Sequence, residues 1–190
     1  MKRVVLSEHQ ITAACGYLGA NLSNELKNEA KTPVFLCVMR GGLPFMADLI
    51  KQLDIDILWD YIQISSYESF EGTPIVSLAK DVSIDLSERT VVIVEDVVDT
   101  GLTVRFLLEH LKKNFNPKRV LVCTLIDKVK ARRYEVPIDY YGLRFEENEF
   151  LLGYGLDYKG LMRNTPYVYV PDEEERAKWD KELLLKKKAG

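Results

Sequence analysis

The chain has 190 residues, a formal net charge of −3, 47% hydrophobic residues and 29% charged residues. These values are typical of one globular domain with a real core, and they argue against a basic surface that recruits nucleic acid. The apolar runs are too short to span a bilayer and the first residues lack a signal-peptide core, so we expect a cytoplasmic protein without a membrane partner.

The predicted elements alternate between helices and strands. Residues 7–30 have the pattern of an amphipathic helix capped by Ser7. Residues 65–76 mix Ser, Gly, Pro and acids, which predicts a mobile loop or a loose hairpin. The other expected elements, in chain order, are strand 34–39, a helix reaching about residue 53, strand 55–64, strand 91–94, a helix containing Val104, Leu107, Leu108 and Leu111, strand 120–126, strand 140–144 and a solvated C-terminal helix at about 172–188. This alternation predicts an α/β fold with a mostly parallel twisted sheet flanked by helices.

The three cysteines show no paired spacing. Cys37 and Cys123 fall in predicted buried strands, and Cys15 falls in an Ala-rich helical stretch. We therefore expect three free thiols in the core of a protein from a reducing compartment.

The most informative segment is residues 91–103, which read VVIVEDVVDTGLT. Four apolar residues predict a buried strand, Glu95 and Asp96 follow it, and a polar turn at 99–103 opens a helix. Ligands of parallel sheets bind beyond the carboxyl ends of the strands, so acids, backbone N–H donors and a helix N-terminus should share one crevice. Gly101 permits the turn to adopt a positive φ around an anion. The segment thus suits a substrate with a phosphate and vicinal hydroxyls.

This segment resembles the phosphoribosyl-pyrophosphate (PRPP) motif of type I phosphoribosyltransferases, and most closely the hypoxanthine-guanine (6-oxopurine) branch. The resemblance implies one phosphoribosyltransferase domain over 1–190, with a core at about 30–130 and a small hood from about 1–30 and 140–170. It implies magnesium-dependent transfer of the 5-phosphoribosyl group from PRPP to N9 of hypoxanthine or guanine. The products are IMP or GMP and pyrophosphate, in purine salvage. A homodimer or homotetramer is the expected assembly.

The resemblance also assigns the residues that hold PRPP. They are Asp99, Thr100, Gly101, Leu102 and Thr103 for the 5′-phosphate, Glu95 and Asp96 for the ribose hydroxyls and the magnesium ion, and Arg40, Gly41 and Arg163 for the pyrophosphate. Leu102 replaces a residue that is more often polar, and its role there is through the backbone. In the family the peptide before the basic residue of the pyrophosphate loop is often non-proline cis, which here implies Met39–Arg40.

The purine contacts implied by the resemblance come from two later segments. Lys128 would donate to the 6-oxo group, Phe150 would stack on the base, and Leu151 would read the base edge through its backbone. Asp157 would lie beside the purine and help to hold the magnesium ion. Without the resemblance, Lys128 is equally well an exposed lysine after a strand, and residues 150–152 are a core strand.

The resemblance also implies that Asp99 is the catalytic base, accepting the proton from purine N7 as N9 attacks C1′. A helix-capping role is the alternative. Ser66 and Tyr67 match the tip of a flexible loop that closes over the reaction centre and excludes water.

Two other functions remain open from the sequence. One is a regulator that keeps this fold and binds PRPP or RNA as a sensor, which the presence of Asp99, Arg40 and Arg163 argues against. The other is a transferase of the same fold for adenine, orotate or uracil, which Lys128 and Phe150 argue against.

Overall fold

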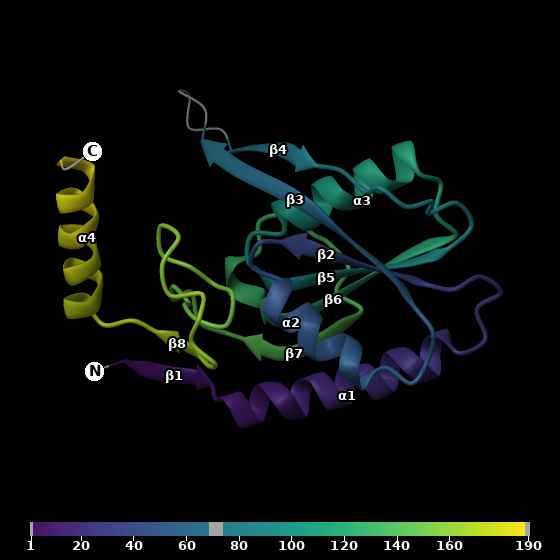
Figure 1. The fold of residues 1–190 in the computed structure, drawn as a ribbon, viewed down its shortest axis with the longest axis horizontal. Helices are drawn as coiled ribbons and strands as arrows, with labels where there is room; N and C mark the ends of the chain where they lie inside the picture. The colour runs from purple at the N-terminus through teal and green to yellow at the C-terminus, as the bar shows by residue number, and fades with distance from the viewer. Residues whose placement is uncertain (1, 69–73, 189–190) are drawn as a thin grey trace.

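The computed structural model describes residues 2–68 and 74–188 and is shown in Figure 1. Its elements, in chain order, are β1 (Arg3–Leu6), α1 (Glu8–Leu26), β2 (Val34–Met39), α2 (Leu43–Leu49), the short 3-10 helix η1 (Ile50–Gln52), β3 (Leu58–Glu68), β4 (Pro74–Lys80), β5 (Thr90–Val98), α3 (Leu102–Asn114), β6 (Arg119–Lys128), η2 (Val129–Ala131), β7 (Tyr140–Phe145), β8 (Val168–Val170) and α4 (Glu173–Lys188).

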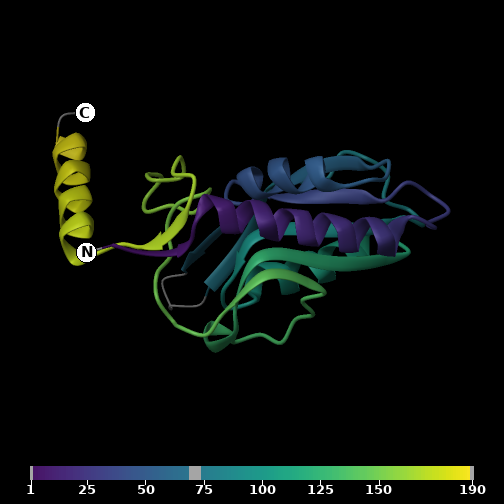
Figure 2. The ribbon, with the colours of Figure 1, turned by 90° about the horizontal axis from the view of Figure 1, so that it is seen from below.

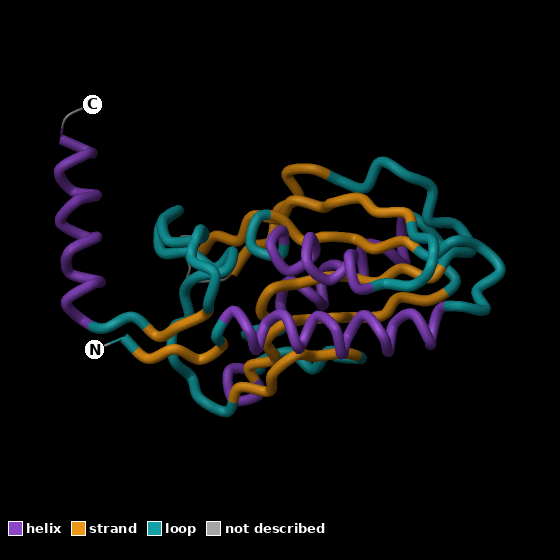
Figure 3. The backbone as a smooth tube through the Cα atoms, turned by 60° about the horizontal axis from the view of Figure 1, so that its bottom comes forward, coloured by secondary structure: helices purple, strands orange, loops and turns teal. Residues whose placement is uncertain are grey.

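The main sheet has six strands in the order β4-β3-β2-β5-β6-β7. Strands β2, β3, β5, β6 and β7 pair in parallel, and only β4 pairs antiparallel, with β3. Helices α1 and α2 cover one face of the sheet, and α3 covers the other, as the tube in Figure 3 illustrates. The predicted mostly parallel, helix-flanked sheet is therefore confirmed.

Side chains of the central strands alternate between two apolar layers. Phe35 and Cys37 of β2 point toward α1 and α2, whereas Val34, Leu36 and Val38 pack on the α3 side. This alternation follows from the two-residue period of a strand, and a strand buried on both faces must be apolar throughout. The three cysteines are free and buried, as expected.

Helix α1 begins where the sequence indicates. The Ser7 side chain accepts a hydrogen bond from the Gln10 backbone N–H at 3.3 Å, and the Gln10 side chain accepts one from the Ser7 N–H at 2.9 Å. This reciprocal capping box confirms Ser7 as the cap. The helix ends at Leu26, four residues before the predicted end.

Two expectations about strand length are wrong. The predicted strand 55–64 begins at Leu58 and continues to Glu68, because its second half pairs with β4 in a hairpin. The hairpin alternative for residues 65–76 is thus confirmed on both flanks, and residues 69–73 lie outside the described residues. Strand β5 runs to Val98, four residues past the predicted end, since β6 pairs with it as far as Val98 and Asp127.

A second, two-stranded sheet joins the two ends of the chain. β1 pairs antiparallel with β8, two short strands that the sequence reading did not identify. Figure 2 shows that helix α4 stands beside this small sheet, away from the six-stranded sheet. Helix α4 is not fully solvated, because Trp179 is only 7% exposed and packs with Leu152 and Tyr169. None of the helices in the described part of the chain combines the length and apolar character that a membrane crossing requires.

Candidate active site

The candidate site lies at the carboxyl edge of the main sheet. Strands β2, β5 and β6 are neighbours and parallel, so their C-terminal ends come together. A cavity of about 260 Å³ opens at this edge. Its lining residues are Gly41, Asp96, Val97, Asp99, Lys128, Phe150, Leu151, Leu156, Asp157 and Arg163. Four segments that are far apart in the sequence therefore meet in one space.

Glu95 and Asp96 lie within strand β5 and do not emerge from it, which corrects the sequence expectation. They are 7% and 6% exposed, and the Glu95 Oε2 atom is buried without a hydrogen-bond partner. Burial raises the pKa of Glu95 well above its usual range, and the neighbouring Asp96 charge raises it further. Burial also raises the pKa of Asp96. A buried acidic pair of this kind favours cations and hydroxyl donors as ligands.

The turn at 99–103 is built as an anion cradle. Gly101 has a φ of 86° and forms the N-cap of α3 without a side chain of its own. The Leu102 N–H donates to Thr100 Oγ1 at 3.4 Å, a long contact that a bound anion could replace. A second hollow at this turn is lined by Glu95, Val97, Val98, Asp99, Thr100, Gly101, Leu102, Thr103 and Val104. The structure thus brings all five predicted phosphate-turn residues together around one space.

Arg132, which the sequence analysis did not single out, stabilises this turn through its backbone carbonyls. Its guanidinium donates to the backbone carbonyls of Val98 and Asp99, at 3.3 and 3.2 Å, and forms an ion pair with the buried Asp127. The Thr100 carbonyl accepts two further backbone hydrogen bonds, from Arg133 and Tyr134, both at 3.0 Å. The only signal in the sequence was a buried-strand aspartate five residues before an arginine, which is too common to be informative.

Asp99 and Lys128 lie side by side at the centre of the cavity. The Lys128 Nζ donates to Asp99 Oδ2 at 3.0 Å. The Lys128 side chain is 6% exposed whereas the Asp99 side chain is 51% exposed. The reading of Lys128 as an exposed lysine is therefore wrong, because β6 extends through Lys128 and buries its side chain against the turn.

The β2–α2 loop approaches the acidic pair through its glycine. A Cβ atom at Gly41 would meet Asp96 Oδ2 at 2.1 Å, so no larger residue fits between the loop and that carboxylate. The Met39–Arg40 peptide is cis, as the resemblance implied. The Arg40 side chain is exposed and does not line the cavity, whereas Gly41 does.

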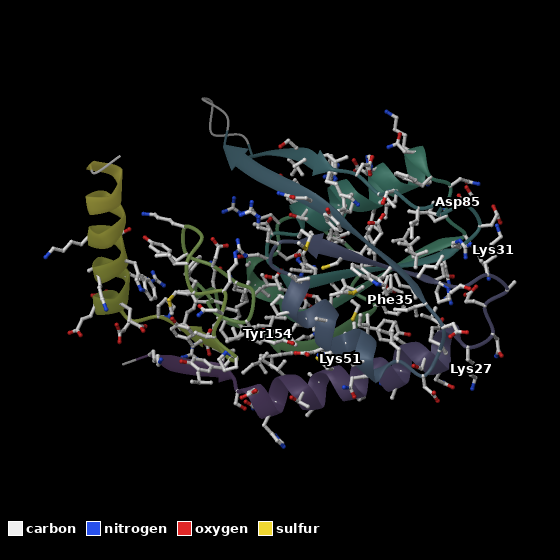
Figure 4. The ribbon with its side chains drawn as sticks, viewed as in Figure 1. Lys27, Lys31, Phe35, Lys51, Asp85 and Tyr154 are labelled. Atoms are coloured by element: carbon white, nitrogen blue, oxygen red, sulfur yellow. The ribbon has the colours of Figure 1, made fainter. Side chains whose placement is uncertain are left out.

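A turn at 153–155 packs directly against this loop. A Cβ atom at Gly155, whose φ is +97°, would meet the Gly41 carbonyl oxygen at 2.1 Å. The intervening Tyr154 points toward α2, as Figure 4 illustrates, and its hydroxyl donates to Asp48 Oδ2 at 2.7 Å. The segment that carries the predicted purine contacts therefore packs against the predicted pyrophosphate loop, with Gly155 directly beside the Gly41 carbonyl.

The remaining predicted residues come from the segment 150–163. Phe150, Leu151, Asp157 and Arg163 all line the cavity. Arg163 forms an ion pair with Asp157, with Nη2 and Oδ1 2.6 Å apart. Leu152 is fully buried and bonds to Tyr169 through the backbone, as a core residue should. Val97 and Leu156 also line the cavity, although the sequence analysis assigned them no role.

The carboxylates do not form a metal site by themselves. Among the described residues, no group of three or more His, Cys, Asp or Glu side chains is arranged to hold a metal ion. Asp96 and Asp157 nevertheless line the same cavity, and Glu95 adds the unpartnered buried oxygen. This set fits magnesium, which typically takes one or two carboxylates and completes its shell with phosphate oxygens and water.

Ser66 and Tyr67 lie in strand β3, in the hairpin with β4. Their backbones pair with Val76 and Ile75. Asp60 anchors the base of this hairpin, because its carboxylate accepts hydrogen bonds from Lys80 Nζ at 2.8 Å and from the Ser83 N–H at 2.6 Å. The predicted loop closure stays a prediction.

Comparison with known proteins shows which family this chain resembles in sequence and structure. Residues 5–159 match the phosphoribosyl transferase domain family. A hypoxanthine-guanine phosphoribosyltransferase of Streptococcus pneumoniae is 37% identical over 175 residues, covering 92% of this chain and 95% of the relative. A hypoxanthine-guanine-xanthine phosphoribosyltransferase of Tritrichomonas foetus is 37% identical, with 91% and 93% covered. A crystal structure of a hypoxanthine phosphoribosyltransferase from Staphylococcus aureus superimposes with a TM-score of 0.84 at 34% identity, covering 90% of this chain and 92% of that one.

Proposed function

Since this chain belongs to the phosphoribosyl transferase domain family, we propose that the cavity beside Asp99 is where it transfers the 5-phosphoribosyl group of PRPP to a purine. The protein is a glycosyltransferase of purine salvage that acts on 6-oxopurines. The bond between N9 and C1′ forms as the bond from C1′ to the pyrophosphate oxygen breaks. The products are a purine nucleotide and pyrophosphate.

One observation carries the assignment of the base site, namely the Asp99 carboxylate lying 3.0 Å from the Lys128 ammonium. A 6-oxopurine presents an acceptor at O6 beside a proton at N7. The ammonium can donate to O6 while the carboxylate accepts the N7 proton, so the two charges match this edge of the base. Adenine would instead place an amino donor against the ammonium. We infer that Asp99 is the general base, worth ~10² to 10⁴ in rate.

The PRPP groups are assigned to the surrounding elements. The turn from Asp99 to Thr103 would bind the 5′-phosphate through backbone N–H groups and the dipole of α3. Glu95 and Asp96 would face the ribose hydroxyls, and Gly41, Arg40 and Arg163 the pyrophosphate. Because Arg40 is exposed, its side chain would have to turn toward bound pyrophosphate. Fixing both ends of PRPP around C1′ supplies the orientation on which the transfer depends.

Asp96, Asp157 and Glu95 are the residues that would hold a magnesium ion, shared with pyrophosphate oxygens and water. When bound, magnesium neutralises charge on the leaving pyrophosphate. The raised pKa values of Glu95 and Asp96 support this role, because a buried acidic pair gains from a nearby cation. Phe150 and Leu151 would complete the purine pocket by stacking and by backbone contacts.

Two broader properties are also proposed. Trp59 and Tyr61 are exposed aromatic side chains two residues apart on one face of β3, which supports a homodimer or homotetramer. Three free buried thiols suit a cytoplasmic location. Light scattering of the purified protein tests the assembly.

The activity is tested by incubating the protein with hypoxanthine, PRPP and magnesium chloride and following IMP formation by absorbance. Guanine and xanthine provide parallel substrates, and adenine provides the mismatched base. We expect turnover with at least one 6-oxopurine and little with adenine. Nucleotide formation from adenine alone would contradict the assignment of Lys128.

A further inference from the structure

Helix α4 is attached to the segment that carries the expected purine contacts. Trp179 packs with Leu152 and Tyr169 in a small apolar cluster separate from the two layers of the main sheet. Figure 1 shows α4 beside the loops that follow β7, with the main sheet on their other side. Helix α4 therefore packs against the segment that carries the expected purine contacts.

The Phe150 ring makes one cation–π contact, with Arg176 of α4, and one aromatic contact, with Tyr158. The Arg176 guanidinium lies over the Phe150 ring, with its Cζ 5.4 Å from the ring centroid. The Tyr158 ring meets Phe150 edge-on, at 6.0 Å between centroids and an interplanar angle of 80°. Both geometries are attractive: the cation lies over the negative face of the Phe150 ring, and a T-shaped pair brings the positive edge of one ring to the negative face of the other.

Tyr158 is itself fixed by α4. Its hydroxyl donates to Asp180 Oδ1 at 2.9 Å, and its ring lies 5.9 Å from that of Trp179. Lys159 adds an ion pair to the same Asp180 oxygen at 2.7 Å. Arg176, Trp179 and Asp180 thus hold the two aromatic rings from one helix.

The contacts with Arg176 and Tyr158 matter because the backbone segment around Phe150 does little to fix the orientation of its ring. It lies outside any strand and is 42% exposed, yet it lines the cavity. A stacking ring that is free to rotate must be ordered when the ligand binds, which weakens affinity. A ring already held by a cation on one face and by a T-shaped contact with a tyrosine avoids most of that cost.

We propose that α4 forms the outer wall of the purine site, with Arg176 as a positioning residue that holds Phe150 for stacking against the base. This inference rests on the proposed function, since it takes Phe150 as the stacking face. Arg176 acts on the purine side alone and has no part in binding PRPP.

Steady-state kinetics of the full chain test the proposal with three matched variants. Arg176→Gln removes the cation and keeps most of the side-chain length, Arg176→Lys keeps a cation, and Lys178→Gln removes the same charge from an exposed position on the same helix. We expect Arg176→Gln to raise KM for hypoxanthine roughly 3- to 10-fold and to leave KM for PRPP unchanged. Arg176→Lys should recover part of the loss, and Lys178→Gln should match the original protein.

A double-variant cycle with Phe150→Leu separates this mechanism from a general loss of structure. In the Phe150→Leu background, Arg176→Gln should have no further effect on KM for hypoxanthine. Equal rises of KM for both substrates, or an undiminished effect without the Phe150 ring, would overturn the proposal. If Phe150→Leu raises KM for hypoxanthine and Arg176→Gln does not, the inference fails and the proposed function stands. If the unsubstituted protein makes no nucleotide, the proposed function fails first.

Discussion

The Lys128 ammonium donates to the Asp99 carboxylate at 3.0 Å, and only the carboxylate is substantially exposed to solvent. Lys128 is the last residue of β6, and Asp99 is the first residue after β5, the parallel neighbour of β6. The ammonium and the carboxylate are therefore hydrogen-bond and ion-pair partners of each other. In the proposed function, a 6-oxopurine would replace this contact with one hydrogen bond to each of the two groups.

Replacing Asp99 by Asn tests the catalytic base. The amide keeps an acceptor for Lys128 but cannot take a proton from N7, so we expect kcat to fall by ~10² to 10⁴ with little change in KM for PRPP. Asp56→Asn alters an exposed carboxylate before β3 and should leave the kinetics unchanged. Near-normal turnover of Asp99→Asn would show that Asp99 is not the general base.

Replacing Lys128 by Met tests recognition of the 6-oxo group. A lost hydrogen bond to a charged donor is worth about 1.5–3 kcal/mol, so kcat/KM for hypoxanthine should fall by one to two orders of magnitude. The preference for hypoxanthine over adenine should narrow as well. Lys130→Met changes an exposed lysine two residues away and provides the control. An unchanged preference would place O6 recognition elsewhere.

The buried acid Glu95 makes stability depend on pH in a defined direction. Its pKa is raised above the ordinary value of 4.5, so the native state keeps a proton that the unfolded chain releases. The stabilisation is complete below the ordinary pKa and is lost as the pH rises. Glu95→Gln cannot ionise, so its free energy of unfolding at pH 8 should exceed that of the original protein.

Urea unfolding at pH 4 and pH 8, without ligands, measures this effect. The increase in the free energy of unfolding caused by Glu95→Gln should be present at pH 8 and shrink toward zero at pH 4. A gain of the same size at both pH values would show that packing, and not ionisation, is responsible.

The contact between Gly155 and Gly41 can be isolated with two alanine variants. Gly155 and Gly160 have similar positive φ values, +97° and +89°, but only a Cβ at Gly155 would strike another segment, the Gly41 carbonyl. Both substitutions carry the cost of the positive φ. We expect Gly155→Ala alone to raise KM for PRPP, because it displaces the β2–α2 loop. Equal kinetics for the two variants would exclude this coupling.

Replacing Arg132 by Gln tests the support behind the phosphate turn. The change removes the nearer of the two cations beside the buried Asp127 and leaves Arg144, whose Nε is 3.6 Å from Asp127 Oδ2. Stability should therefore fall, by less than the roughly 3–5 kcal/mol that a fully unpaired buried charge costs. It also removes both hydrogen bonds to the carbonyls of residues 98 and 99, so KM for PRPP should rise. Arg133→Gln is the control, because the exposed Arg133 contributes its backbone N–H to the turn. A stability loss without any rise in KM would limit Arg132 to a structural role.

The sequence by itself determined the chemistry-bearing segments of this protein. Local pattern was sufficient for the buried strands, for the Ser7 cap and for the polar turn after β5, because each depends on residues close together in the chain. The motif around Asp99 indicated a phosphate and sugar ligand, and most residues assigned by resemblance do line one of two adjoining hollows.

Only the tertiary structure decided how those segments support one another. The extension of β5 past Glu95 and Asp96, and hence their burial, depends on pairing with β6. The roles of Arg132 behind the turn and of Arg176 on Phe150 depend on contacts between segments that no local pattern links. The physical reason is that burial and ion pairing are set by neighbours in space, and these neighbours are fixed by the packing of the whole chain.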